Sequence, residues 1–432
     1  MPNSSNEVKS NDFQEKLDLA DINVGDSERG NKSNDTLQQQ LDQLQLQEPR
    51  FKFWNTQPVP KLGEIVTENT YINNSVTVEK VQQEPYKLPI GMHWNEIDLA
   101  DPGELKDLYT FLSLNYVVDN DNMFRFDYSL ELLQWVLMPP GWQKFWHLGI
   151  RIDGSNKLIG FLGAYPIHIQ VYEKDVKCIE YNFLCVHQEF RSIGLCPLLI
   201  QEIIRRANLK GIFQATFTAG IIIPKPIAYC QYWHRSLNPK KLIETRFSSL
   251  KPGMTMEKTI EFYNISKTPL QNIIPLQEIH VKSAYKLLMN HLKNYKLYPL
   301  LTEDEFRHHL LPRKNVIYSY VLVDEKENVT DFCSFYNLPT TVINHSIHKE
   351  IKAAFSFYNV ATTISFKDLL HNALIMANKA NFDVFTALDI MQNVPSILKD
   401  LKFGMGDGFL QYYLYNWKCP NLSPNEIGFV LQ

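Results

Sequence analysis

The sequence is short of the features that mark a membrane-spanning or nucleic-acid-binding chain. No stretch reaches the roughly 18 consecutive apolar residues that a membrane-spanning helix needs, so we expect no transmembrane segment. The 43 basic and 47 acidic residues give a net charge of −4, which argues against a dedicated nucleic-acid binder because such proteins usually carry a strongly basic face. The N-terminus, MPNSSNEVKS, has neither an apolar signal core nor a myristoylation consensus.

Cysteine is also scarce. The six cysteines are scattered and none forms a CxxC pair, so we expect no structural zinc and no other metal. Cys185 and His187 are close in sequence, but no third partner is visible, and we do not expect a thiol nucleophile. Such a low cysteine density fits a reducing compartment, where cysteines are mostly small buried hydrophobes. We therefore expect a cytoplasmic protein and leave open a peripheral membrane attachment.

What the chain has in quantity is apolar and aromatic residues. Of its 432 residues 44% are hydrophobic, and 25 Phe and 21 Tyr bring the aromatic share to 12%. This is ample for a large core and for a long apolar pocket. Residues 1–50 differ, since they hold 5 basic and 10 acidic residues and the biased stretch TLQQQLDQLQLQ. We predict a disordered, acidic, Gln-rich tail there, with a transient helix as the alternative.

After this tail one order of elements occurs twice, as two helices, three strands, a helix and a strand. The first set is predicted at 102–116, 129–137, 144–152, 157–171, 177–187, 197–209 and 212–218. The second is predicted at 276–295, 303–311, 316–323, 329–337, 351–361, 365–380 and 383–389. This repetition indicates internal duplication, with halves at 51–250 and 251–432. The final strand candidate, FLQYYLYNWK at 409–418, is expected to pair across the two halves.

The repeated order is the layout of the GNAT acyltransferase fold. We therefore predict an α/β protein in which two tandem GNAT-like halves form one saddle-like mixed sheet with flanking helices. Fold alone does not establish function.

The strongest local motif is a strand, loop and helix at 181–209. Its loop contains Arg191, Gly194 and Cys196, in an R-x-x-G-x-(small) pattern. Free backbone N–H groups at the start of a helix bind phosphate, and the positive end of the helix dipole adds to this. GNAT proteins hold the CoA pyrophosphate with this pattern. An ordinary helix start remains the alternative for the pattern taken by itself.

Many collinear segments resemble the glycylpeptide N-myristoyltransferase family. They are FWNTQPV at 53–59, EPYKLP at 84–89, DNMFRFDY at 121–128, YNFLCVH at 181–187, GIFQA at 211–215, YWHRSLNP at 232–239, KFGMGDG at 402–408 and LQYYLYNWK at 410–418. The resemblance runs from about residue 51 to the end of the chain. It implies a monomeric transferase that moves myristate from myristoyl-CoA, a co-substrate, to the α-amino group of an N-terminal glycine in proteins or peptides, with no prosthetic group.

The resemblance also implies how the reaction is catalysed. It assigns the oxyanion donors to the backbone amides of Phe183 and Leu184, and a β-bulge at this strand end would turn two amides outward. The base is the terminal carboxylate of Gln432, with Asn182 and Thr218 near the amine. The apolar run 427–431 favours a buried, positioned carboxylate, although a strand that merely packs is the alternative.

Two further sets of site residues follow from the resemblance. The N-terminal half is expected to bind acyl-CoA through Lys52, Phe53, Trp54, Phe183, Leu184, Cys185, Val186, Arg191, Ser192, Gly194, Leu195 and Cys196. The C-terminal half is expected to bind the peptide and to end in the catalytic C-terminus, and the peptide groove is assigned Asp119, Asp121, Phe124, Phe126, Tyr232, His234, Tyr358, Asp407 and Gly408. Core packing is the alternative for the two phenylalanines, and a solvated loop for the two aspartates at 119 and 121.

The sequence departs from the family in several places. Ile193 and Gly194 stand where the family has basic residues, and Gln188 replaces a usual lysine, so CoA binding should be weakened. Phe217 replaces a usual Tyr and Tyr181 an aliphatic residue. Two alternatives to an active myristoyltransferase therefore stay open. One is a catalytically weak paralogue that binds acyl-CoA or peptide, and the other is an acyltransferase for another acyl chain or for lysine.

Overall fold

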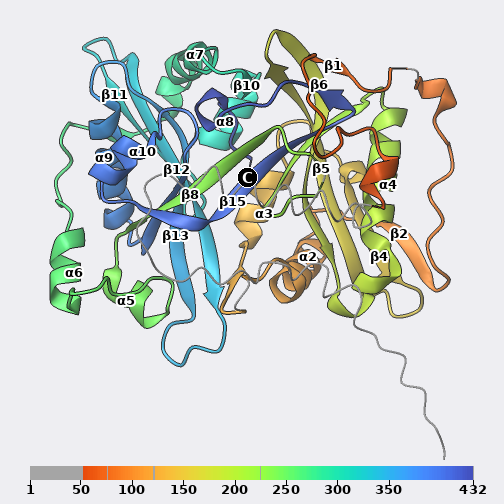
Figure 1. Ribbon diagram of the computed structural model, residues 1–432, viewed down its shortest axis with the longest axis horizontal. Helices are drawn as coiled ribbons and strands as arrows, with labels where there is room; N and C mark the ends of the chain where they lie inside the picture. The colour runs from red at the N-terminus through yellow and green to blue at the C-terminus, as the bar shows by residue number, and fades with distance from the viewer. Residues whose placement is uncertain (1–51, 75, 120–121, 224, 432) are drawn as a thin grey trace, which may run out of the picture.

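The computed structural model describes residues 52–74, 76–119, 122–223 and 225–431. In these residues a large mixed sheet carries helices on its flanks (Figure 1), which confirms the predicted α/β class. The predicted tail at 1–50 lies outside the described residues, as do Asp121 and Gln432.

Every predicted helix is present to within a few residues of its expected bounds, and three short helices of the described residues accompany them. Together they are α2 (Pro102–Asn115), α3 (Leu130–Leu137), α4 (Leu195–Leu209), α5 (Pro239–Glu244), α6 (Met256–Tyr263), α7 (Val281–Leu292), α8 (Glu303–Leu310), α9 (Phe366–Lys379) and α10 (Pro395–Asp400). Side-chain caps fix several starts; for example, the Asp101 carboxylate accepts a hydrogen bond from the Glu104 amide at the start of α2. The start of α7 was predicted too early, because Glu278–His280 forms a 3₁₀ turn in front of it. The short helices α5, α6 and α10 were not predicted.

The strands follow the predicted order. They are β1 (Thr70–Tyr71), β2 (Met92–Glu96), β3 (Phe124–Phe126), β4 (His147–Ile152), β5 (Leu158–Val171), β6 (Lys174–Val186), β7 (Gln214–Ala219), β8 (Ala228–Ser236), β9 (Ile274–Pro275), β10 (Leu297–Pro299), β11 (Ile317–Val323), β12 (Val329–Val342), β13 (Glu350–Val360), β14 (Val384–Leu388), β15 (Gly404–Tyr415) and β16 (Trp417–Lys418). Strand β8 was not predicted, and neither were the shorter strands β1, β2, β9 and β10.

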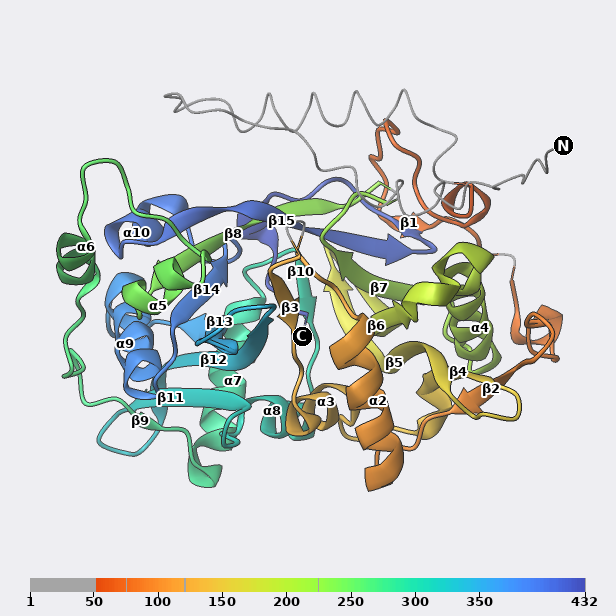
Figure 2. The same cartoon turned by 90° about the horizontal axis from the view of Figure 1, so that it is seen from below.

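The sheet contains the same four-strand unit twice. In each unit three strands form an antiparallel meander, β4–β5–β6 and β11–β12–β13. A helix, α4 or α9, then leads to a fourth strand that pairs in parallel, β7 or β14. The structure thus confirms the predicted duplication of element order, and Figure 2 shows α4 and α9 at opposite ends of the molecule.

Strands β15 and β8 join the two units into one sheet. Strand β15 pairs with β7 on one side and with β8 on the other, and β8 pairs with β14. The predicted pairing of FLQYYLYNWK across the halves is therefore confirmed. Because β8 belongs to the first half of the sequence but lies beside β14, the halves exchange strands at the centre of the sheet.

Candidate active site

The site begins where two parallel strands separate. Strand β6 pairs with β7 only from Cys178 to Glu180, the last pair being Glu180 with Thr216. Beyond that point β7 continues alongside β15, where Thr218 pairs with Tyr412. The predicted residues Asn182 and Thr218 therefore stand two positions past this fork, on the two strands that diverge.

A β-bulge lies on β6 immediately after the fork. Gly163 of β5 pairs with Asn182 and Phe161 pairs with Cys185, so Phe183 and Leu184 together oppose a single residue. Phe183 has φ of +57°, a left-handed conformation that is uncommon for a large side chain. The expected bulge is confirmed, and it sits at the two residues whose amides were predicted to face the substrate. The Phe183 amide donates a hydrogen bond to Asn182 Oδ1 at 2.8 Å.

Tyr116, at the end of α2, was not identified from the sequence. Its buried ring lies 5.9 Å from the Phe183 ring. Burial raises the pKa of Tyr116 well above its ordinary value, and a hydrogen bond with the Phe183 backbone offsets part of that effect. A neutral hydroxyl therefore lies beside the bulge. Nothing in the sequence around Tyr116 marks it, because its position depends on how α2 packs against β6.

The loop after β6 leads directly into a helix whose first turn has no side-chain cap. The 3₁₀ turn η5 (Gln188–Ile193) ends at Gly194, which has φ of +79°, and α4 starts at Leu195. The predicted strand–loop–helix motif is thus confirmed. Free first-turn amides and the positive end of the helix dipole form a ready anion-binding end.

Arg191 holds this turn in place through the backbone. Its Nε donates to the Val186 carbonyl at 3.1 Å and its Nη2 to the Asn115 carbonyl at 2.6 Å. These bonds tie η5 to the ends of β6 and α2. The guanidinium is therefore engaged structurally as well as being the loop's predicted phosphate-binding side chain.

Two cysteines close to Arg191 are poor nucleophiles. Burial raises the pKa of the Cys185 thiol to about 12 and that of Cys196 to about 11. Both thiols are neutral near pH 7, which argues against a thiolate mechanism at this site.

Half of the residues predicted to bind acyl-CoA gather on one face of β6. A single apolar cluster under α4 includes Phe53, Trp54, Leu184, Val186, Leu195 and Cys196. Trp54 stacks on Phe217 at 5.6 Å, and Phe217 stacks on Tyr181 at 4.6 Å. Lys52 is exposed at the edge of this region. Phe183 and Cys185 instead face the opposite cluster, so the strand carries predicted residues on both sides.

The predicted peptide-binding aromatics lie on β8 and its surroundings. The rings of Tyr232 and His234 are nearly parallel at 6.4 Å. Phe247 contacts both His234, at 5.5 Å, and Phe124, at 5.7 Å. Burial lowers the pKa of His234 to about 4, so its imidazole is neutral near pH 7. The structure thus brings Phe124, Tyr232 and His234 into one region, and Phe247 belongs to it although it was not predicted.

The KFGMGDG segment forms a bulge against these rings. Gly404 pairs with His234, whereas Phe409 pairs with Gln231, so residues 406–408 loop out opposite Tyr232. A Cβ on Gly406 would lie 2.8 Å from His234 Nε2, and one on Gly408 would lie 3.3 Å from the Tyr232 ring. Glycine is needed here for close approach. Asp407, between them, is exposed.

Asp119 holds the turn that precedes β3. Its Oδ1 accepts hydrogen bonds from the Met123 and Phe124 amides at 2.7 and 2.6 Å. Strand β3 in turn pairs with β12, where Phe126 is opposite Thr340. One carboxylate oxygen of Asp119 is therefore already engaged in shaping the loop.

The C-terminal segment is buried in the centre of the molecule. Ile427, Phe429, Val430 and Leu431 are all buried, which confirms the expectation drawn from this apolar run. The Tyr412 hydroxyl donates to the Phe429 carbonyl at 2.8 Å, and the Val430 amide donates to the Tyr358 hydroxyl at 3.3 Å. The chain is thus anchored up to the residue before Gln432.

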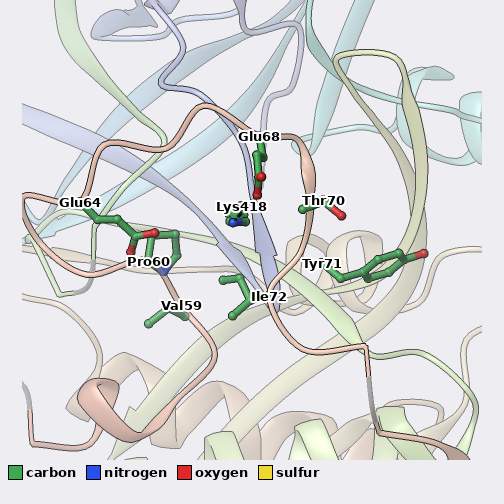
Figure 3. Close-up of a pocket in the computed structure, with 8 residues that line it drawn as sticks. All are labelled: Val59, Pro60, Glu64, Glu68, Thr70, Tyr71, Ile72 and Lys418. Carbon is green, nitrogen blue, oxygen red and sulfur yellow. Dashed lines mark ion pairs between the residues drawn. The ribbon is translucent and has the colours of Figure 1, made fainter.

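Two surface hollows involve none of the predicted site residues. One, shown in Figure 3, is lined by Val59, Pro60, Glu64, Glu68, Thr70, Tyr71, Ile72 and Lys418. An ion pair between Glu68 and Lys418 at 2.5 Å crosses it and ties the segment before β1 to β16. The other lies between Pro140 and the end of α8.

Two features are absent from the described residues. No helix there has the length and apolar character to cross a membrane. No group of three or more His, Cys, Asp or Glu side chains there is placed to hold a metal ion.

Comparisons with known proteins identify the family. A model of the N-terminal domain of myristoyl-CoA:protein N-myristoyltransferase matches residues 71–230, and a model of the C-terminal domain matches residues 244–430. The chain is 50% identical to a probable glycylpeptide N-tetradecanoyltransferase of Caenorhabditis elegans, over 88% of this chain and 86% of the relative. It is 49% identical to glycylpeptide N-tetradecanoyltransferase 2 of Danio rerio, over 89% and 77%.

A solved structure agrees with these matches. The crystal structure of Saccharomyces cerevisiae N-myristoyltransferase with bound myristoyl-CoA superposes with a TM-score of 0.84 at 34% identity, over 88% of this chain and 99% of that one. The two family models together match both halves of the chain, and the overall fold matches a solved N-myristoyltransferase. The chain therefore belongs to the myristoyl-CoA:protein N-myristoyltransferase family.

Proposed function

We propose that this protein transfers the myristoyl group of myristoyl-CoA to the α-amino group of an N-terminal glycine. The observation that carries the proposal is the bulge at Phe183 and Leu184, directly past the β6–β7 fork and before the uncapped start of α4. An acyl-CoA with its phosphates at the helix end would place its thioester near these amides. Family membership supplies the substrate class.

The reaction we propose needs no covalent enzyme intermediate. The glycine amine attacks the thioester carbonyl, a C–N bond forms, and the C–S bond breaks to release CoA as its thiol. The amides of Phe183 and Leu184 stabilise the oxyanion, for which the Phe183 amide gives up its hydrogen bond to Asn182 Oδ1, and losing one such donor typically costs about 3 kcal/mol of barrier. A glycine amine with a pKa of roughly 8 arrives mostly protonated, so a base must take its proton.

We assign that base to the terminal carboxylate of Gln432. Support comes from the segment before it, which is buried and hydrogen-bonded to Tyr412 and Tyr358. One proton moves from the ammonium to the carboxylate before attack, and the departing thiolate takes the second proton, which the nitrogen loses as the amide forms. Asn182 and Thr218, on either side of the fork, orient the amine.

We assign acyl-CoA to the face of β6 under α4, and the peptide to the side that holds Tyr232, His234 and Tyr358. Because glycine alone lacks a Cβ, a tight wall around its Cα would exclude other residues. The closely packed Gly406 and Gly408 contribute to the narrowness of the groove. The cytoplasmic location and monomeric state expected above are part of this proposal.

The decisive assay follows product by mass spectrometry. The protein is mixed with myristoyl-CoA over a wide concentration range and with a glycine-starting peptide, and a peptide identical except for an N-terminal alanine serves as the control. We expect N-myristoylation of the glycine peptide alone. A folded protein that forms no product at any acyl-CoA concentration would contradict the proposal.

One observation favours a second candidate, a paralogue that binds acyl-CoA or peptide with little catalysis. Arg191 is bonded to two carbonyls, and Ile193 and Gly194 add no charge to the loop. Binding of myristoyl-CoA without any product would support this candidate.

A cation restored to the loop should strengthen acyl-CoA binding. Ile193 is 46% exposed, so Ile193→Lys places an ammonium at the anion-binding end without disturbing the core. An exposed pair of this kind is worth about 0.2–1 kcal/mol, which corresponds to a decrease in the KM for myristoyl-CoA of about 1.4- to 5-fold. Gly194 is unsuitable for the same change, because its φ of +79° would strain any side chain.

The control for this prediction is Ile221→Lys. Ile221 is exposed to a similar extent, 48%, but lies in the loop after β7. It should leave the KM for myristoyl-CoA unchanged. Equal KM values for Ile193→Lys and the wild type would show that the loop needs no further charge.

A further inference from the structure

A buried carboxyl group stands at the β6–β7 fork and has no role in the mechanism above. Glu180 is the last residue of β6 that pairs with β7, and its side chain is only 2% exposed. Its Oε1 has no hydrogen-bond partner within the described part of the chain. An unpartnered polar atom in a dry core is costly, so its retention beside a candidate active site calls for a functional reason.

Glu180 lies on the same side of β6 as the candidate catalytic residue Asn182. Side chains two residues apart on a strand face the same way, and the bulge begins only after Asn182. Cys178, two residues earlier, belongs to the core cluster that also holds Phe429, Val430 and Leu431. The Glu180 carboxyl thus faces the core that holds residues 429–431.

The carboxyl is surrounded by hydroxyl and thiol groups from several strands. Tyr165, its direct cross-strand partner on β5, hydrogen-bonds it. Tyr336 on β12, Tyr358 on β13 and Cys178 on β6 itself are close enough to sense its charge. Glu305 of α8 adds a negative charge that acts on Tyr165, and the Val430 backbone amide, an uncharged donor, donates a hydrogen bond to Tyr358. No cation among these groups faces Glu180.

These surroundings keep the carboxyl neutral. Burial raises the pKa of Glu180 to about 8, and the hydrogen bond with Tyr165 offsets part of this rise. A protonated carboxyl adds no second negative charge to a core that would already contain the terminal carboxylate. It also keeps a proton that can be shared with the tyrosine hydroxyls around it.

We propose that Glu180 is a positioning residue for acyl transfer, which acts through Tyr358 on the C-terminal segment. This inference rests on the proposed function. The Tyr358 hydroxyl accepts a hydrogen bond from Val430, two residues before the chain end. A neutral Glu180 leaves that hydroxyl in place, whereas an ionised Glu180 draws the tyrosine protons toward itself and disturbs the segment that carries the carboxylate.

The test compares Glu180→Gln, a neutral side chain of the same shape, with Glu180→Leu. For Glu180→Leu we expect kcat to fall about tenfold, with the KM for myristoyl-CoA unchanged, and Glu180→Gln should recover most of that loss. The wild type should lose kcat as pH rises through about 8, and Glu180→Gln should lack this alkaline decline. Melting temperatures measured under the conditions of the kinetic assay show whether either variant has lost activity only because it is unfolded.

The pH dependence of folding stability tests the protonation of Glu180 independently of the kinetics. In the unfolded chain Glu180 loses its proton near pH 4.3, but in the folded protein it keeps the proton up to about 8. The unfolded state therefore binds fewer protons between these values, and the wild type loses stability as pH rises across that window. The melting temperature of Glu180→Gln relative to the wild type should rise from pH 5 to pH 8 and then level off.

A double-mutant cycle tests the route through Tyr358. Tyr358→Phe removes the hydroxyl that receives the Val430 hydrogen bond and should lower kcat. The double variant with Glu180→Leu should lose less activation free energy in kcat than the sum of the two single losses, because both changes disrupt the same link between Glu180 and the C-terminal segment. Three outcomes would each overturn the proposal. The losses in kcat of the two single variants could add up in the double variant, or the pH profiles of kcat could be parallel for the wild type and Glu180→Gln. The third is a kcat for Glu180→Gln as low as that for Glu180→Leu. A wild type without product at any pH would instead reject the proposed function itself.

Discussion

Adding a single residue after Gln432 should lower kcat by about 100-fold or more, with little change in the KM for myristoyl-CoA. A positioned general base typically contributes about 10²–10⁴-fold to a rate, and the extension moves the carboxylate by one residue. The segment cannot slide to compensate. Tyr412 holds the Phe429 carbonyl, Tyr358 holds the Val430 amide, and Gly428 donates to the Leu297 carbonyl at 2.7 Å. Steady-state kinetics with a glycine-starting peptide make the measurement.

One control and one second perturbation of the same carboxylate separate this effect from general damage. Gln432→Asn keeps both the chain length and the carboxylate and should keep most of the activity. Gly428→Ala moves the carboxylate in another way, because its Cβ would lie 2.7 Å from the buried Tyr295 ring and displace the segment. It should lower kcat without any added residue. An extended protein as active as the wild type would refute the terminal base.

Gly406→Ala should raise the KM for the peptide by about tenfold and leave the KM for myristoyl-CoA unchanged. The new Cβ would lie 2.8 Å from His234 Nε2 and 3.1 Å from the Tyr232 carbonyl oxygen. Relieving such overpacking costs about 1–3 kcal/mol, and about 1.4 kcal/mol is a tenfold change in an equilibrium constant. The displaced elements are the β15 bulge and the β8 rings, which we assign to the peptide and not to acyl-CoA.

The matched control is Gly404→Ala, two residues earlier on the same strand. A Cβ at Gly404 would meet only the His234 carbonyl oxygen, at an ordinary contact distance of 3.9 Å. This variant should retain the wild-type KM for both substrates. If Gly406→Ala leaves peptide kinetics unchanged, or if both variants change the KM for myristoyl-CoA, the assignment of this bulge to the peptide groove is wrong.

Much of the fold was predictable because local sequence determines it. The start of α2 follows from Asp101 and Pro102, and that of α9 from the capping Ser365. Long apolar strands such as β5 and β12 were equally clear. Strand β8 was missed because AYCQYWHRS mixes aromatic and polar residues on both faces, and its place between β15 and β14 depends on partners far away in sequence.

Some residues of the candidate site were predictable from the sequence and others were not. The resemblance of the sequence to the family pointed to Phe183, Leu184 and the loop at Arg191, and comparison with the solved structures supports the same fold. Residues that act through distant neighbours gave no signal. Tyr116 meets the Phe183 backbone only because α2 packs against β6, and Phe247 joins His234 to Phe124 across three segments.

The sequence by itself determined the duplicated order of elements, the family and the buried character of residues 427–431. Each of these follows from a local hydrophobic pattern or from collinear motifs. Only the tertiary structure decided where β6 and β7 part, that the bulge falls directly after that fork, and that one oxygen of Glu180 has no hydrogen-bond partner among the described residues. Pairing between strands and the burial of a charge depend on segments that are distant in the chain, and no local pattern records them.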